Sequence, residues 1–219
     1  MNDSTALVTG AHVGSRDAAR GARAVAEIGG GARLLVLDVT DDESVTEAAR
    51  QVESLDILIN NAGIMVDGRS APEADVDSFR RTYETNLFGV LAVTNAFLPA
   101  LRRSAVPRIV NVSSGTGSLS WNADPEHPFA ASGGSGAAYR SSKTALNALT
   151  LYYAQALAAE GFKVNTLAPG LRATDLNSRA AASDGDPAEA AAGAVRLALL
   201  PDDGPTGQFF SWDGTPAPW

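Results

Sequence analysis

Short, nearly uninterrupted apolar runs alternate with segments of helical period along this 219-residue chain. Such alternation is typical of βαβ units, in which a helix connects each strand of a parallel sheet to the next. We expect strands at residues 6–10, 32–39, 55–60, 107–113, 162–168 and 207–211. Because most of these runs are continuous rather than alternating, helices should cover both faces of the sheet. The sequence therefore predicts a doubly wound α/β fold with a parallel sheet of about six strands.

Helix signals fill the gaps between the apolar runs. Thr40 followed by Glu43 is a capping box, which predicts the start of a helix. Longer helices are expected over residues 76–97, 139–159 and 187–200. No repeat, low-complexity tract or interdomain linker interrupts the pattern, so we expect one domain over residues 1–219.

Composition narrows the function classes. The chain has no cysteine, which excludes disulfides and thiolate nucleophiles, and its two histidines, His12 and His127, are too few and too far apart to predict a metal site. A net charge of −8 argues against binding to nucleic acid or anionic lipid. The first residues show no signal peptide and no apolar run is long enough to span a membrane, so we expect a cytoplasmic protein.

Polar and glycine residues gather where the predicted strands end. In a doubly wound sheet, ligands bind beyond the carboxyl ends of the strands. These ends read Thr9-Gly10-Ala11, Asp38-Val39, Asn60-Asn61-Ala62-Gly63, Ser113-Ser114 and Pro169-Gly170.

Tyr139 and Lys143 are four residues apart at the start of a predicted helix, which places both side chains on one helix face. A lysine ammonium beside a phenol favours the phenolate, so we expect Lys143 to lower the pKa of Tyr139. Tyr139 would then serve as an acid or base near neutral pH. A lone YxxxK spacing also fits an exposed tyrosine and a solvated lysine, so the other motifs must decide.

Five motifs occur in one order: Asn-Asn-Ala-Gly at 60–63, Asn86 within YETNLFGV, NVSS at 111–114, YRSSK at 139–143 and APGLRAT at 168–174. Together they resemble the short-chain dehydrogenase/reductase family, which implies a Rossmann-like fold. The long gap between Ser114 and Tyr139, with LPDDGPTGQFF near the end, looks most like the carbonyl-reductase-like branch. That resemblance implies reduction of aldehydes and ketones with NADPH, often by a monomer.

The resemblance assigns four catalytic residues. Tyr139 would donate the proton to the carbonyl oxygen, and Ser114, rather than Ser113, would hold that oxygen. Lys143 would lower the pKa of Tyr139 and bind the nicotinamide ribose. Asn86 would distort its helix and hold a water molecule that links Lys143 to solvent.

The same resemblance assigns the cofactor site. Asp38 would reach the adenine amino group, and Val39 would supply a backbone contact. Asn60, Ala62 and Gly63 would line the adenosine ribose. Pro169, Gly170 and Thr174 would approach the nicotinamide amide and the pyrophosphate, where glycine lets the backbone come close to a ligand.

The amino-terminal segment departs from the family pattern TGxxxGxG. Gly10 and Gly14 keep the spacing of the first two glycines, but Arg16 stands where the third is expected. Read literally, Asp17–Ile28 would be the first helix and residues 32–39 the second strand. Asp38 would then bind the ribose hydroxyls and favour NAD, although it lies farther from Gly10 than the usual ~20 residues.

We favour a second interpretation, in which VGSRDAARGARAVAEI is the end of the family's second strand and the helix after it. One βα unit near the amino terminus, about 20 residues, would then be missing. Gly14 would be a strand-end glycine, and Arg16 would pair with the 2′-phosphate of NADP. The sheet would expose apolar surface that a second subunit could cover.

The sequence thus predicts an NADP(H)-preferring oxidoreductase that reduces a ketone or aldehyde to an alcohol. Its partners would be the small-molecule carbonyl compound and alcohol, and it would be a monomer or a homodimer. The alternative is a cofactor-poor relative that acts as a binding or assembly protein and keeps the catalytic residues without using them.

Overall fold

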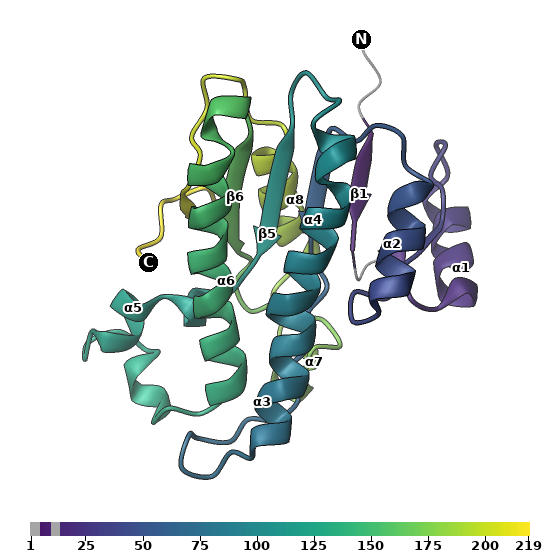
Figure 1. The fold of residues 1–219 in the computed structure, drawn as a ribbon. Helices are drawn as coiled ribbons and strands as arrows, with labels where there is room; N and C mark the ends of the chain where they lie inside the picture. The colour runs from purple at the N-terminus through teal and green to yellow at the C-terminus, as the bar shows by residue number, and fades with distance from the viewer. Residues whose placement is uncertain (1–4, 10–13) are drawn as a thin grey trace.

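The computed structural model describes residues 5–9 and 14–219 as an α/β fold around a parallel sheet (Figure 1). Five strands form the central sheet in the order β1 (Ala6–Val8), β4 (Ile57–Asn60), β5 (Arg108–Val112), β6 (Lys163–Ala168) and β7 (Phe209–Ser211). A second sheet pairs β2 (Gly14–Ser15) with β3 (Leu35–Val36), also in parallel. All six predicted strand regions are confirmed, most of them shorter than expected, and β2 is an additional strand.

β2 connects the two sheets. A parallel bridge joins Thr9, directly after β1, to Gly14, the first residue of β2. β2 therefore starts at the level where β1 ends. A Cβ on Gly14 would lie only 2.9 Å from the carbonyl oxygen of Val8, so a side chain would force β1 and β2 apart. Gly14 is thus a strand glycine, as the favoured interpretation of the amino-terminal segment expects.

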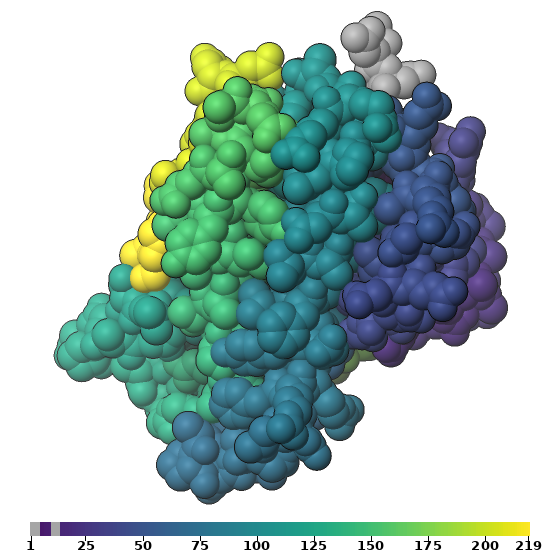
Figure 2. Space-filling view, viewed as in Figure 1, coloured from purple at the N-terminus to yellow at the C-terminus, as the bar shows by residue number. Residues whose placement is uncertain are grey.

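Helices pack against both faces of the central sheet. On one face, α2 (Asp42–Arg50), α4 (Gly89–Leu101) and α6 (Ala137–Ala156) bury a core that includes Val45, Phe97 and Tyr153. On the other face, α8 (Pro187–Ala198) buries Leu197 against Ile57 and Ile59. Helix α1 (Ala18–Ile28) contacts β2 and β3, and with α2 it forms the right-hand edge of the molecule in Figure 2.

Apolar surface remains open near β3. Leu35 is buried in the core beneath α2, whereas its neighbour Val36, whose side chain points to the opposite face, is 49% exposed. The expected uncovered apolar face of the amino-terminal sheet stays a prediction, because Val36 is a single exposed side chain.

Two predicted helix details are corrected. Asp41, not Thr40, caps α2, because its side chain accepts hydrogen bonds from the amides of Glu43 and Ser44. The stretch predicted as one helix over 76–97 is divided into α3 (Val76–Tyr83) and α4 by a π-helical turn, η1 (Glu84–Phe88).

The carboxyl ends of the strands lie at the lower side of Figure 1, where α3 and α6 begin. The segment between Ser114 and Tyr139 lies there too, with the short helices η2 (Gly115–Gly117), α5 (Leu119–Ala123) and η3 (Ala130–Ser132), and so does α7 (Ser178–Ala181). Within the described part of the chain, no helix combines the length and apolar character needed to cross a membrane.

Candidate active site

Tyr139 and Lys143 share one face of α6, as their spacing predicted. The Nζ atom of Lys143 lies 5.7 Å from the centroid of the Tyr139 ring. Lys143 is buried, and its Nζ donates a hydrogen bond of 2.9 Å to the carbonyl oxygen of Val112, the last residue of β5. The strand end therefore holds the lysine ammonium beside the phenol.

The charge states of these two groups differ from the sequence-based expectation. Burial raises the pKa of Tyr139 to about 12, and a hydrogen bond with the Ser114 side chain only partly offsets this rise. Burial also lowers the pKa of Lys143 to about 8. The net shift of the Tyr139 pKa is therefore upward, against the expected lowering, because loss of solvation outweighs the other contributions. Tyr139 is protonated at neutral pH and suited to donate a proton.

Ser114 and Ser113 have different environments, because Ser114 is partly exposed and Ser113 is buried. Ser114 is partly exposed and caps η2, with its Oγ accepting from the amide of Thr116 and 2.9 Å from the Thr116 hydroxyl. Ser113 is buried, and its hydroxyl donates to the backbone carbonyl of Lys143. Ser114 is also the serine whose side chain acts on the pKa of Tyr139, and its catalytic assignment by motif stays a prediction.

Asn86 lies in the π-helical turn η1 and is completely buried. Its Oδ1 accepts from the amide of Ile64 at 2.8 Å, and its Nδ2 donates to the carbonyl of Ile64 at 2.9 Å and to the Ser142 hydroxyl at 3.0 Å. The distorted helix agrees with the expectation. The Asn86 side chain thus connects the loop after β4, through Ile64, to α6, through Ser142. The sequence motifs did not indicate these two contacts.

Two glycines let the catalytic elements approach each other. A Cβ on Gly63 would lie 3.4 Å from Lys143 Nζ and 3.5 Å from Asn86 Oδ1, so this residue adjoins both functional groups. A Cβ on Gly117 would lie 2.8 Å from the Lys143 carbonyl carbon. Gly117 therefore allows η2, which carries Ser114 at its start, to pack directly on α6.

The side chain of Asn60 lies inside the protein and does not face the carboxyl edge of the sheet. Its side chain is buried and donates to Thr94 Oγ1 at 3.0 Å and to Asn111 Oδ1 at 2.8 Å, in the interior between the sheet and its helices. The expectation that Asn60 contacts the adenosine ribose is corrected accordingly. Because β4 is buried on both faces, its sequence gave no sign of which face the amide occupies.

Thr9 organises the loop after β4, a role that sequence reasoning missed. Its hydroxyl accepts hydrogen bonds from the amides of Asn61 and Ala62, and its carbonyl accepts from the Asn61 side chain. Ala62 and Gly63 are consequently fixed at the carboxyl ends of β1 and β4, where they are partly exposed.

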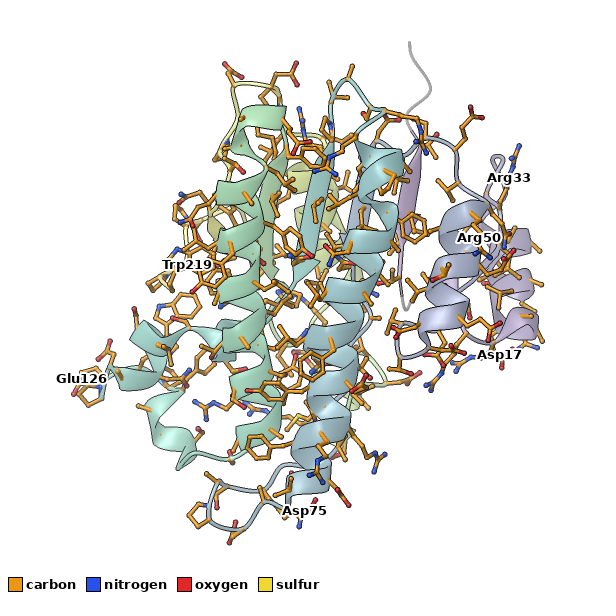
Figure 3. All side chains as sticks on the ribbon, in the orientation of Figure 1. Asp17, Arg33, Arg50, Asp75, Glu126 and Trp219 are labelled. Atoms are coloured by element: carbon orange, nitrogen blue, oxygen red, sulfur yellow. The ribbon has the colours of Figure 1, made fainter. Side chains whose placement is uncertain are left out.

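The residues expected on the adenosine side follow β2 and β3. Asp38 is partly exposed, and its Oδ1 accepts from the amide and hydroxyl of Thr40. Val39 packs with its carbonyl against Gly89, where a Cβ would be 2.8 Å away. Arg16 is exposed and directly precedes Asp17, which caps α1 and is labelled in Figure 3. Gly10 lies outside the described residues.

The loop after β6 contains Pro169, Gly170 and Thr174. Gly170 has a φ of 75°, a conformation that favours glycine, and Thr174 is exposed. Arg172 in this loop, which the motif comparison did not single out, has a side chain that is only 10% exposed. Its Nε donates to the Pro169 carbonyl, and its guanidinium stacks on Trp212 at 4.2 Å.

The segment between Ser114 and Tyr139 is anchored to α6 by Arg140. The guanidinium donates to Ser132, Asn122 and the carbonyl of Phe129. The rings of Trp121 and Phe129 lie against Gly115, each 3.1 Å from the position of an added Cβ. This aromatic pair therefore adjoins the residue after Ser114. Figure 3 labels Glu126 at the outer edge of the segment.

The donor set fits a nicotinamide nucleotide rather than a metal. The hydrogen bond to Val112 uses one of the three N–H donors of Lys143, which leaves two for ribose hydroxyls. Gly63 leaves the ammonium uncovered by a side chain. Among the residues described, no three His, Asp or Glu side chains come together in an arrangement that could hold a metal ion.

The sequence of the chain matches a known protein family and several individual proteins. The family model for short chain dehydrogenases matches residues 4–185. The chain is 43% identical over 149 residues to a short-chain dehydrogenase of Penicillium roqueforti, covering 65% of this chain and 58% of that protein. It is 36% identical over 169 residues to the C-signal protein of Myxococcus xanthus, covering 75% and 93%. The match thus spans less than two thirds of the Penicillium protein.

Solved structures show the same fold. Salutaridine reductase from Papaver somniferum superposes with a TM-score of 0.77 at 28% identity, covering 94% of this chain and 99% of that one. An NADPH-bound carbonyl reductase from chicken fatty liver superposes with a TM-score of 0.79 at 24% identity, covering 99% and 88%.

Proposed function

The chain belongs to the short chain dehydrogenase family, and we propose that it is an NADPH-dependent oxidoreductase that reduces a ketone or aldehyde to an alcohol. The observation that carries the proposal is the joint placement of Tyr139, Lys143, Asn86 and Ser114 at the carboxyl edge of the sheet. Lys143 is held by the end of β5, and Asn86 is held by the loop after β4 and by α6, as expected for a preorganised site.

In this proposal the nicotinamide cofactor supplies a hydride to the carbonyl carbon of the substrate. Tyr139, protonated because burial raises its pKa to about 12, donates its proton to the carbonyl oxygen. Ser114 donates a hydrogen bond to the same oxygen and stabilises the charge that develops there. Lys143 binds the ribose hydroxyls and places a positive charge beside the phenol, which eases loss of the proton.

The preference for NADP(H) rests on Arg16. It follows β2, is exposed, and carries a guanidinium suited to bidentate binding of a phosphate. Asp38 follows β3 instead, and one of its oxygens is already engaged by Thr40. Ala62, Gly63, Val39 and the Pro169–Gly170 turn complete the proposed cofactor site, with Thr174 at its nicotinamide end and Gly10 at its amino-terminal end.

We further propose a small carbonyl compound as the substrate, in contact with Trp121 and Phe129. Their half-buried rings beside Gly115 favour an apolar substituent on that compound. The protein would act as a monomer or as a homodimer that covers Val36.

The first experiment is a titration of the protein with NADPH and with NADH, followed by energy transfer from its three tryptophans. We expect saturable binding that is tighter for NADPH, and Arg16→Ala should weaken only NADPH binding. Tyr139→Phe should bind NADPH normally but lose ketone reduction by a factor of about 10² or more. Equal turnover by wild type and Tyr139→Phe would contradict the proposal.

A second candidate, a binding or assembly protein without catalysis, is favoured by the amino-terminal segment. Only four residues separate Thr9 from Gly14, too few for the crossover helix whose amino terminus commonly binds the pyrophosphate. Failure of a cooperatively folded protein to bind either dinucleotide would support this candidate over the reductase.

A further inference from the structure

Arg172 has a buried guanidinium that is only partly paired. Its Nε donates to the Pro169 carbonyl at 2.8 Å, and its Nη1 donates to Glu189 Oε2 at 2.7 Å. Its Nη2 is inaccessible to solvent and has no hydrogen-bond partner among the described residues. Buried N–H groups are nearly always paired, and an orphaned one on a charged group is costly. Binding of a ligand oxygen to Nη2 would therefore satisfy a donor that has no acceptor among the described residues.

The position of Arg172 suits a ligand. The loop follows β6 at the carboxyl edge of the sheet, the edge at which doubly wound folds bind their ligands. Nη2 lies 3.3 Å from the point that a Cβ on Gly170 would occupy, so a side chain at Gly170 would press against this nitrogen. Stacking on Trp212 fixes the plane of the guanidinium, which limits the entropy lost when it binds.

The described part of the chain shows no helix directly after β1, although such a helix is a common source of phosphate binding. A helix that directly follows the first strand usually presents its amino terminus to the pyrophosphate of a dinucleotide. Here the first helix of the described chain, α1, begins at Ala18 and follows β2 instead of β1. A dinucleotide bound at this edge therefore needs positive charge from another element.

We propose that Arg172 binds a phosphate group of the nicotinamide dinucleotide, and that this phosphate replaces the carboxylate of Glu189. The inference rests on the proposed function. The phosphate oxygens can accept from Nη1 and Nη2 together, the bidentate arrangement that guanidinium groups favour, whereas Glu189 engages Nη1 alone. Glu189 is 47% exposed, so its carboxylate can return to water when it is displaced.

If Arg172 had only a structural role, substitutions of Arg172 and Glu189 would affect dinucleotide binding differently from what we propose. In that case the ion pair with Glu189 would only fasten the loop to α8, and loss of either partner would have the same effect on binding. Under the exchange that we propose, the two partners act in opposite directions, because Glu189 competes with the phosphate for Arg172.

The test compares NADPH binding by wild type, Arg172→Met, Glu189→Gln and Arg179→Met across a range of salt concentrations. Arg179 is an exposed arginine in α7, so its variant controls for the loss of one positive charge. We expect Arg172→Met to weaken binding about tenfold or more and to reduce its salt dependence. Glu189→Gln should tighten binding by about twofold to fivefold. Urea midpoints of all variants show which of them fold normally.

The proposal is overturned if Glu189→Gln and Arg172→Met weaken binding alike, or if Arg172→Met binds as tightly as Arg179→Met. If the wild type binds neither NADPH nor NADH, the proposed function fails, and inorganic pyrophosphate then decides the anion site separately. A pyrophosphate-dependent rise in melting temperature that is lost in Arg172→Met would uphold the site. No rise in the wild type would overturn it.

Discussion

Asn86 holds both backbone groups of Ile64, accepting from its amide at 2.8 Å and donating to its carbonyl at 2.9 Å. This pairing fixes the loop that carries Gly63 against Lys143. We expect Asn86→Ala to lower the free energy of unfolding by about 2 kcal/mol, because it leaves partly buried polar groups unpaired. Asn86→Asp keeps the acceptor but buries a carboxylate against the Ile64 carbonyl, so it should cost at least as much as the alanine variant. Urea denaturation measures both, and an unchanged midpoint for Asn86→Ala would contradict the role given to this pair.

Gly117 provides a test of the packing between η2 and α6. Gly117→Ala places a Cβ 2.8 Å from the backbone of Lys143, so the helix or η2 must shift. We expect a loss of about 1–3 kcal/mol in unfolding free energy, with a marked loss of turnover because Ser114 and Lys143 move apart. Gly68→Ala is the matched control, since a Cβ there has open space and the residue has no positive φ. Equal stability of the two variants would show that the contact relaxes at no cost.

Much of this arrangement follows from local sequence, and some does not. The continuous apolar runs predicted the strand regions because buried parallel strands need apolar side chains on both faces. β2 has only two residues, Gly14 and Ser15, and therefore no hydrophobic period to detect. Its identification depended on resemblance to a family, and its contact with Val8 explains the glycine.

Side-chain environment was the harder part to predict. Spacing placed Tyr139 and Lys143 on one helix face, but burial, which sets both pKa values, depends on elements distant in sequence. Arg172 illustrates the same limit: its partners Glu189 and Trp212 lie 17 and 40 residues further along the chain. Nothing in the loop sequence indicates that this arginine is buried.

The pH dependence of turnover should reflect Lys143. Because burial lowers the pKa of Lys143 to about 8, its charge is lost well before Tyr139, with a pKa of about 12, deprotonates. We expect kcat/KM for ketone reduction, which reports the free enzyme, to fall as pH rises through about 8. A profile that stays flat to pH 10 would show that the ammonium does not assist proton transfer or cofactor binding.

The same shift in Lys143 predicts a pH-dependent stability. Unfolded lysine titrates near its usual value of about 10.4, so between pH 8 and about 10 the unfolded chain binds more protons than the folded one. Linkage then requires the unfolding free energy to rise with pH in this window, by up to about 3 kcal/mol. Above pH 10 the trend should reverse, since Tyr139 and Tyr153 ionise more readily in the unfolded chain. Urea midpoints at pH 7, 8, 9 and 10 measure the effect, and Lys143→Met should abolish the rise because it removes the buried ammonium. A wild-type midpoint that falls steadily from pH 7 to pH 10 would mean that Lys143 is not held in the environment described.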